Sequence, residues 1–93
     1  MNHYPRMTEL ARTFPTLQNA DGLDPFEPSR LAKWLRGPAP CHAAIHAGRF
    51  LLHLFNSRAR YNVGSFQVAD AFATWDHKHR DAFIAWCVAP WWP

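Results

Sequence analysis

One segment of the sequence, from residue 40 to residue 57, constrains the fold more than any other. It is apolar or small at most positions, and its charged and imidazole side chains recur every three or four residues: His42, His46, Arg49 and His53. At about 100° per residue, these four side chains share one narrow stripe of an α-helix. A helix that is apolar over most of its circumference is covered by other elements. We therefore expect a central helix over 40–57.

Prolines, glycines and capping residues divide the N-terminal half into shorter helices. A first helix is predicted over 8–13, because a proline follows closely and the residue before a proline leaves the α region. The second helix has two candidate starts. Asp24 with Glu27 forms a capping-box pattern, whereas Pro28 favours a start three residues later. The Gly-Pro pair at 37–38 ends this helix in either case.

The C-terminal third shows a change of helical phase. A fourth helix is predicted from Ser65, a residue suited to an N-cap, to about residue 75. The residues expected on its buried side are Phe66, Ala69, Phe72, Ala73 and Trp75. The polar run at 76–81 then interrupts the apolar periodicity. We expect a kink or turn there, with Asp76 capping a fifth helix. One continuous helix over 65–88 is the alternative.

The predicted fold class is all-α. We expect a single domain over 1–93, built as a compact bundle of four to five short helices around the helix at 40–57. Hydrophobic residues make up 48% of the chain and aromatic residues 15%, which is enough for a core and too much for intrinsic disorder. Residues 1–7 are expected to form a poorly ordered N-terminal tail.

The sequence favours a cytoplasmic protein without membrane association. No apolar run approaches the roughly 18 residues that indicate a membrane span. The first residues lack the basic-then-apolar order of a signal peptide. In such a compartment we expect Cys41 and Cys87 to be small buried residues and not a disulfide.

The histidine stripe gives only weak support for a metal site. His42 and His46 have the spacing of two ligands on one helix face, but Ala43 stands where a zinc protease carries its general base. His53 lies two turns away. The sequence contains no nucleophile elbow, no phosphate-binding glycine loop and no pair of carboxylates at catalytic spacing. We therefore predict no enzymatic activity, no cofactor, no metal and no small-molecule substrate.

Charge is unevenly distributed along the chain. The segment 28–64 contains no Asp or Glu, and its basic residues form the predicted binding surface: Arg30, Lys33, Arg36, Arg49, Arg58 and Arg60. A surface of one sign favours an anionic partner. Aromatic residues and Arg are also enriched in protein interfaces. We predict a small binding protein of the adaptor or inhibitor type, which docks on another protein or on a second copy of itself.

Nucleic-acid binding is the alternative function. The basic segment is suited to phosphate contacts, and residues 67–86 have some features of a helix-turn-helix, with Lys78, Arg80 and histidines facing DNA. Two features count against this motif. His79 occupies a position where the motif places a buried aliphatic residue, and the carboxylates of Asp76 and Asp81 repel phosphates.

The chain ends in two adjacent tryptophans, Trp91 and Trp92. Large apolar side chains at a chain end either pack on the core or form a docking element for a partner. We expect the core, because a small domain benefits from large buried anchors. Trp91 is expected to be more buried than Trp92, since Pro90 leaves only a short reach back to the bundle.

Overall fold

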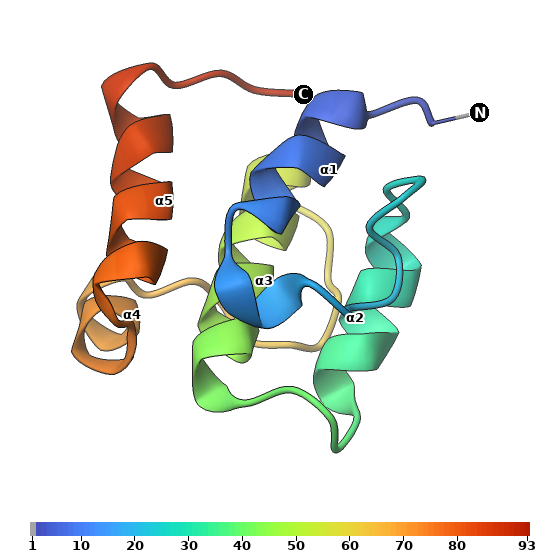
Figure 1. The fold of residues 1–93 in the computed structure, drawn as a ribbon. Coiled ribbons are helices and arrows are strands. Elements are labelled where there is room, and N and C mark those ends of the chain that lie inside the picture. Colours follow the sequence, from blue (N-terminus) through green and yellow to red (C-terminus); the bar gives the residue numbers. More distant parts are fainter. Residues whose placement is uncertain (1) are drawn as a thin grey trace.

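Helix α3 lies at the centre of the computed structural model, which describes residues 2–93 (Figure 1). The elements in chain order are α1 (Pro5–Arg12), the short 3-10 helix η1 (Pro15–Leu17), α2 (Pro28–Arg36), α3 (His42–Phe55), α4 (Val68–Thr74) and α5 (His77–Val88). Elements α1, η1, α2 and α4 all contact α3. No strand occurs among the described residues, and the predicted all-α bundle with a central third helix is confirmed.

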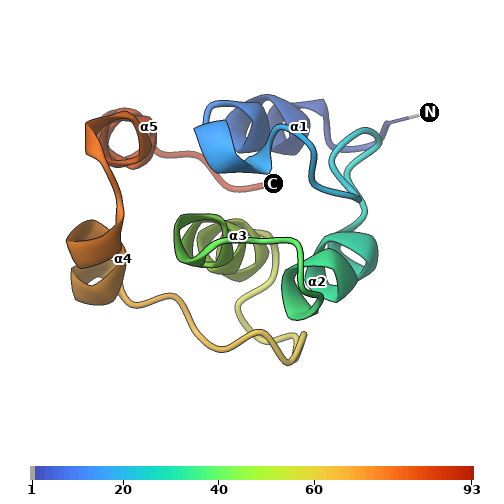
Figure 2. The same ribbon diagram turned by 60° about the horizontal axis from the view of Figure 1, so that its bottom comes forward.

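The layers of the bundle are seen most clearly along α3. Helices α1 and α2 cover two sides of it, and the segment that follows α3 passes beneath α3 and α2 before it reaches α4 (Figure 2). Helix α5 is an outer element beside α1 (Figure 1). The longest helix, α3, has 14 residues, and none of the described helices is long and apolar enough to cross a membrane.

The core is densest where α3 meets α2. Gly48 is buried in α3, and a Cβ atom built on it would lie 2.2 Å from Cδ1 of Leu35 in α2. The absence of a side chain at this position therefore lets the two helices approach closely. On the opposite side of α3, the fully buried ring of Phe14, at the start of η1, packs against Phe50 of α3 and Trp75 at the end of α4.

The N-terminal residues are helical and packed on the domain over a longer stretch than the sequence predicts. Helix α1 begins at Pro5, whose missing N–H is tolerated in a first turn, and not at residue 8. Met7 is only 1% exposed, and Asn2 donates a hydrogen bond to Oγ1 of Thr8 at 2.8 Å. Residues 5–7, which the sequence analysis assigns to a poorly ordered tail over 1–7, thus form the first turn of α1. Met1 lies outside the described residues.

Helices α2 and α4 begin later than their earliest candidate starts. Helix α2 begins at Pro28, the later of the two alternatives, and ends before Gly37 as predicted. Helix α4 begins at Val68 and not at Ser65, because the backbone is still extended at Gln67. Both helices thus lack a side-chain N-cap bond and depend on tertiary packing.

The turn between α4 and α5 is the one that the phase change predicts. Asp76 precedes α5, and its Oδ1 accepts the backbone N–H of His79 at 3.0 Å. This is an N-cap bond, so the prediction that Asp76 caps a fifth helix is confirmed. The alternative of one continuous helix over 65–88 is wrong, since residues 75 and 76 are extended.

Both cysteines are exposed free thiols, and the prediction that they are buried is wrong. Cys41 stands at the N-cap position of α3, outside the apolar part of that helix. Cys87 lies on the outer helix α5, where the exposed side also carries Ile84 and Val88. The general tendency of cysteine to be buried is overridden in both cases by its place at the edge of the bundle.

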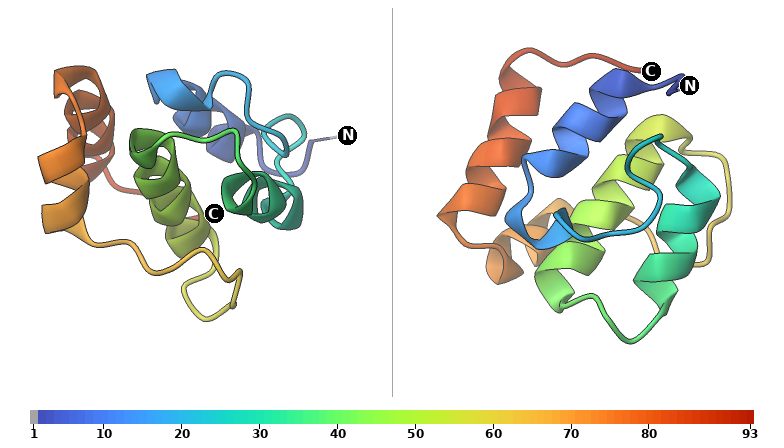
Figure 3. Two further views of the ribbon diagram at one scale, coloured as in Figure 1. Left: turned by 90° about the horizontal axis from the view of Figure 1, so that it is seen from below. Right: turned by 45° about the vertical axis from the view of Figure 1, so that its right-hand side comes forward.

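The C-terminal tail folds back over its own domain. After α5 the chain crosses back towards the N-terminal end of α1 (Figures 1 and 3), where Trp91, Trp92 and Pro93 line one pocket together with residues 3–7. The indole N–H of Trp86 donates to the carbonyl oxygen of Trp91 at 3.0 Å. The Arg6 guanidinium lies 4.2 Å from the ring centroid of Trp91. Trp91 is half-buried against the core and Trp92 is 70% exposed, the order that the sequence predicts.

Candidate functional site

The six predicted basic residues have different partners in the fold. Arg30 forms ion pairs with Asp21 at 2.7 Å and with Glu27 at 3.3 Å, both of which lie outside the acid-free segment. These carboxylates raise the pKa of Arg30, with the hydrogen bond to Glu27 as the main cause. The positive charge of Arg30 is thus largely balanced locally. We therefore separate it from the other five.

Two arginines hold the segment between α3 and α4. Arg36 at the end of α2 donates to the carbonyl oxygen of Tyr61, and Arg49 in α3 donates from Nε to the carbonyl oxygen of Val63 at 2.5 Å. Gly64 lies directly against Arg49, since a Cβ atom there would be 2.9 Å from Nη2, and its φ of +81° also favours glycine. Both arginines bind neutral carbonyl groups, so each keeps its positive charge.

The three remaining cations lie on α2 and on the segment itself. Lys33 lies one helical turn before Arg36 in α2, and Arg58 and Arg60 belong to the segment itself. We call these five residues the basic face: Lys33, Arg36, Arg49, Arg58 and Arg60. Within residues 2–93, none of the five forms an ion pair with a carboxylate. The fold therefore concentrates positive charge that it does not neutralise.

An open pocket lies within the basic face. It has a volume of about 230 Å³. Its lining is Arg49, Leu52, His53, Asn56, Ser57, Ala59, Arg60, Tyr61, Asn62, Val63, Gly64 and Ser65. None of the described residues that line it is acidic. We call it the basic pocket. Its lining is suited to the carboxylate or phosphate oxygens of a partner.

The histidine stripe is only partly exposed. His42 and His53 are exposed as expected, but His46 and Arg49 are half-buried, because the segment after α3 covers the middle of the stripe. Burial lowers the pKa of His46 below its ordinary value, and the nearby Arg49 adds to this shift. No group of three or more His, Cys, Asp or Glu side chains within the described chain is arranged to hold a metal ion.

The adjoining surface contains a second pocket, which is aromatic. It has a volume of about 300 Å³, and we call it the aromatic pocket; its lining is Phe50, His53, Leu54, Ser57, Phe66, Phe83, Trp86 and Trp92. Phe50 is buried, whereas Phe66, Phe83 and Trp86 are half-buried. The pocket exists because α5 stands off from α3, and aromatic rings bridge the space between them only in part.

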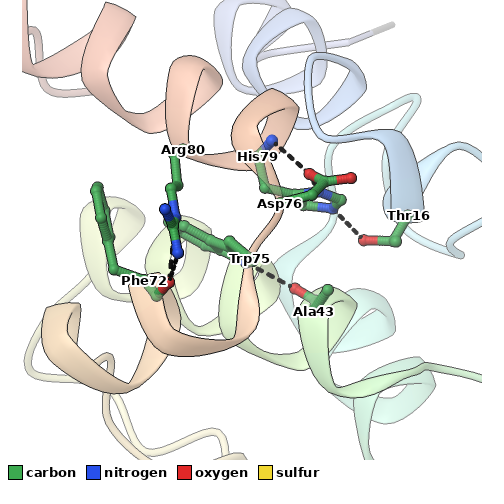
Figure 4. Close-up of polar contacts among 7 residues, drawn as sticks. All are labelled: Thr16, Ala43, Phe72, Trp75, Asp76, His79 and Arg80. Carbon is green, nitrogen blue, oxygen red and sulfur yellow. Dashed lines mark hydrogen bonds and ion pairs between the residues drawn. The ribbon is translucent and has the colours of Figure 1, made fainter.

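A polar network missed by the sequence analysis connects α5 with η1 (Figure 4). Nδ1 of His79 lies 2.7 Å from Oδ1 of Asp76, and Nε2 lies 2.8 Å from Oγ1 of Thr16. The order of carboxylate, imidazole and hydroxyl is that of a catalytic triad. However, His79 is 2% exposed, and its ring packs on Phe14 and Trp75. An imidazole enclosed in this way connects elements of the fold and is poorly placed to reach a substrate.

Helices α4 and α5 do not present the surface of a helix-turn-helix reader. His79, at the position where the motif places a buried residue, is buried, but Arg80, expected to face DNA, donates from Nε to the carbonyl oxygen of Phe72 at 3.1 Å (Figure 4). Further along α5 the exposed side carries two apolar residues, Ile84 (45% exposed) and Val88 (79% exposed). A recognition helix places hydrogen-bonding side chains against base edges, which these residues do not supply.

No protein-family model, no curated protein and no solved structure matches this chain.

Proposed function

We propose that the protein is a non-enzymatic binding module that docks on an acidic surface of another protein through the basic face. The observation that carries this proposal is that Arg36 and Arg49 both bind the short segment that contains Arg60, and that none of these three arginines forms an ion pair with an acidic residue within the described range. Unbalanced charge of one sign steers and orients an oppositely charged partner.

An acidic protein is favoured over nucleic acid as the partner. Arg36 and Arg49 are held by backbone carbonyls of one short segment, whereas binding to a nucleic acid uses cations that contact phosphates spaced along its backbone. The aromatic pocket next to the basic face adds the kind of side chains that protein interfaces favour. We place this docking in the cytoplasm, since two exposed free thiols suit a reducing compartment.

The proposal is tested by binding to immobilised polyglutamate and to duplex DNA at increasing salt. We expect retention on polyglutamate at low salt and a steep loss as salt rises, because exposed charges are screened. The double variant Lys33→Ala/Arg60→Ala should bind much more weakly. The control Arg12→Ala/Lys78→Ala removes the same charge elsewhere and should bind nearly as the wild type. Equal losses in both variants, or retention on DNA alone, would contradict the proposed function.

A further inference from the structure

The basic pocket and the aromatic pocket share a border. His53, in the last turn of α3, and Ser57, just beyond its end, line both of them. The two pockets are therefore adjacent, and one extended ligand can contact both. The two linings differ sharply in character, since one contains two arginines and the other contains five aromatic rings.

The aromatic pocket has the shape of a receptacle for one large apolar side chain. Its rings stand steeply to one another: Phe50 and Phe83 are 4.9 Å apart at 83°, and Phe50 and Trp86 are 5.4 Å apart at 70°. Trp92 forms an exposed wall, packed edge-on against Trp86 at 5.7 Å. A volume of about 300 Å³ is at the lower limit for small-molecule pockets but suits a single side chain.

From this juxtaposition we infer the chemistry of the partner, and the inference rests on the proposed function. The composite site binds a short acidic segment of another protein that carries one bulky apolar residue. That residue enters the aromatic pocket, and carboxylates that flank it lie against Arg60 and His53 in the basic pocket. The partly exposed rings gain from being covered by an apolar group, while the cations give the charge complementarity.

A single-stranded nucleic acid is the competing ligand, because bases stack on aromatic rings beside cations. Stacking needs a flat, accessible ring face for each base. In this pocket Phe50 is buried, and Phe66, Phe83 and Trp86 present edges and inclined faces. Only Trp92 is largely exposed among the lining rings. A concave set of inclined rings fits an inserted side chain better than a row of stacked bases.

The test is fluorescence anisotropy with three fluorescein-labelled probes at low salt. The first is a short glutamate-rich peptide with one central phenylalanine. The second is the same peptide with serine in place of the phenylalanine, and the third is a short oligo-dT strand. We expect the phenylalanine peptide to bind about tenfold or more tightly than the serine peptide, as burial of one such side chain predicts.

Two variants with a matched control locate the site. Trp92→Ala removes the exposed wall of the aromatic pocket and should weaken binding of the phenylalanine peptide by about fivefold or more, with little effect on the serine peptide. Arg60→Ala should weaken binding of both peptides. Val88→Ala changes an even more exposed apolar residue that does not line the pocket, and it should bind as the wild type.

The outcomes separate this inference from the proposed function. Equal affinity for the two peptides, still sensitive to Arg60→Ala, would overturn the role of the aromatic pocket and leave docking through the basic face intact. Tighter binding of oligo-dT than of either peptide, weakened by Trp92→Ala, would overturn both. A preference for the phenylalanine peptide that survives Trp92→Ala unchanged would place the anchor elsewhere and contradict the inferred site.

Discussion

The Asp76 carboxylate lies 2.7 Å from Nδ1 of His79, and the same oxygen accepts the backbone N–H of His79 at 3.0 Å. Both bonds favour the ionised carboxylate, and they lower the pKa of Asp76 below its ordinary 3.8, with the side-chain bond as the largest cause. Asp76 therefore joins the start of α5 to the buried imidazole through one charged oxygen.

This arrangement predicts a specific acid sensitivity. A lowered folded-state pKa means that the stabilisation is fully present above the unfolded-state pKa and is lost as the pH falls through the folded-state value. Asp76→Asn should melt at a lower temperature than the wild type at neutral pH, and the difference should shrink as the pH falls below about 4. Circular dichroism melts across the pH range measure this. Asp81→Asn, an exposed carboxylate change on the same helix, is the control. A difference that stays constant at all pH values would contradict the role of the charge.

The hydroxyl of Thr16 is expected to stabilise the fold through the same imidazole. Thr16→Val keeps the shape of the side chain but leaves Nε2 of His79 buried without a partner. Such a loss costs about 1–3 kcal/mol of unfolding free energy. Urea denaturation should show this loss, whereas Thr74→Val on the exposed side of α4 should change stability by less than about 0.5 kcal/mol. Equal stability of the two variants would mean that the bond between Thr16 and His79 does not contribute to the free energy of unfolding.

Glycine at position 48 is predicted to give a more stable protein than alanine, although glycine is usually unfavourable inside a helix. Alanine gains about 1 kcal/mol over glycine in a helix interior. Here its Cβ would lie 2.2, 2.6 and 2.9 Å from three side-chain atoms of Leu35, so α2 and Leu35 must move, and overpacking costs about 1–3 kcal/mol. We expect Gly48→Ala to destabilise by about 1 kcal/mol on balance. A denaturation midpoint above that of the wild type would show that Leu35 relocates freely.

The sequence predicted the elements with strong periodicity and failed where an element is short. Helix α3 spans 14 residues, so its stripe is sampled over several turns. Helix α4 spans only 7 residues, and the apolar pattern that located it included Phe66 and Trp75, which lie outside the helix. As a result Ala69 and Ala73 were assigned to the buried side, whereas Ala71 is the buried residue.

The candidate site was less predictable, because its properties depend on partners distant in the sequence. The charge of Arg30 is balanced by Asp21, outside the acid-free segment, and Arg36 binds a carbonyl group 25 residues away. The aromatic pocket combines side chains of α3, α5 and the tail, which no local pattern relates. A local clue to the buried network existed, since Asp76 and His79 are three residues apart at a helix start.

The tail offers the sharpest distinction between a structural and a functional aromatic residue. Trp91 is half-buried against the core and is covered by Arg6, whereas Trp92 is 70% exposed. A fully buried tryptophan replaced by alanine costs about 3–5 kcal/mol, so a half-buried one should cost about 2 kcal/mol. Trp91→Ala should therefore lower the unfolding free energy by about that amount, and Trp92→Ala should change it by less than about 0.5 kcal/mol.

Deletion of residues 91–93 should cost somewhat more than Trp91→Ala, because it also removes the backbone carbonyl that accepts the Trp86 indole N–H. A domain with a typical stability of about 5–15 kcal/mol stays folded after such a loss. The deletion should also abolish the preference for an apolar anchor, since it removes the exposed wall of the aromatic pocket. Urea denaturation and peptide anisotropy on the same protein samples separate the two effects. A deletion variant as stable as the wild type would show that Trp91 does not hold the tail on the domain, and the whole tail would then be a docking element.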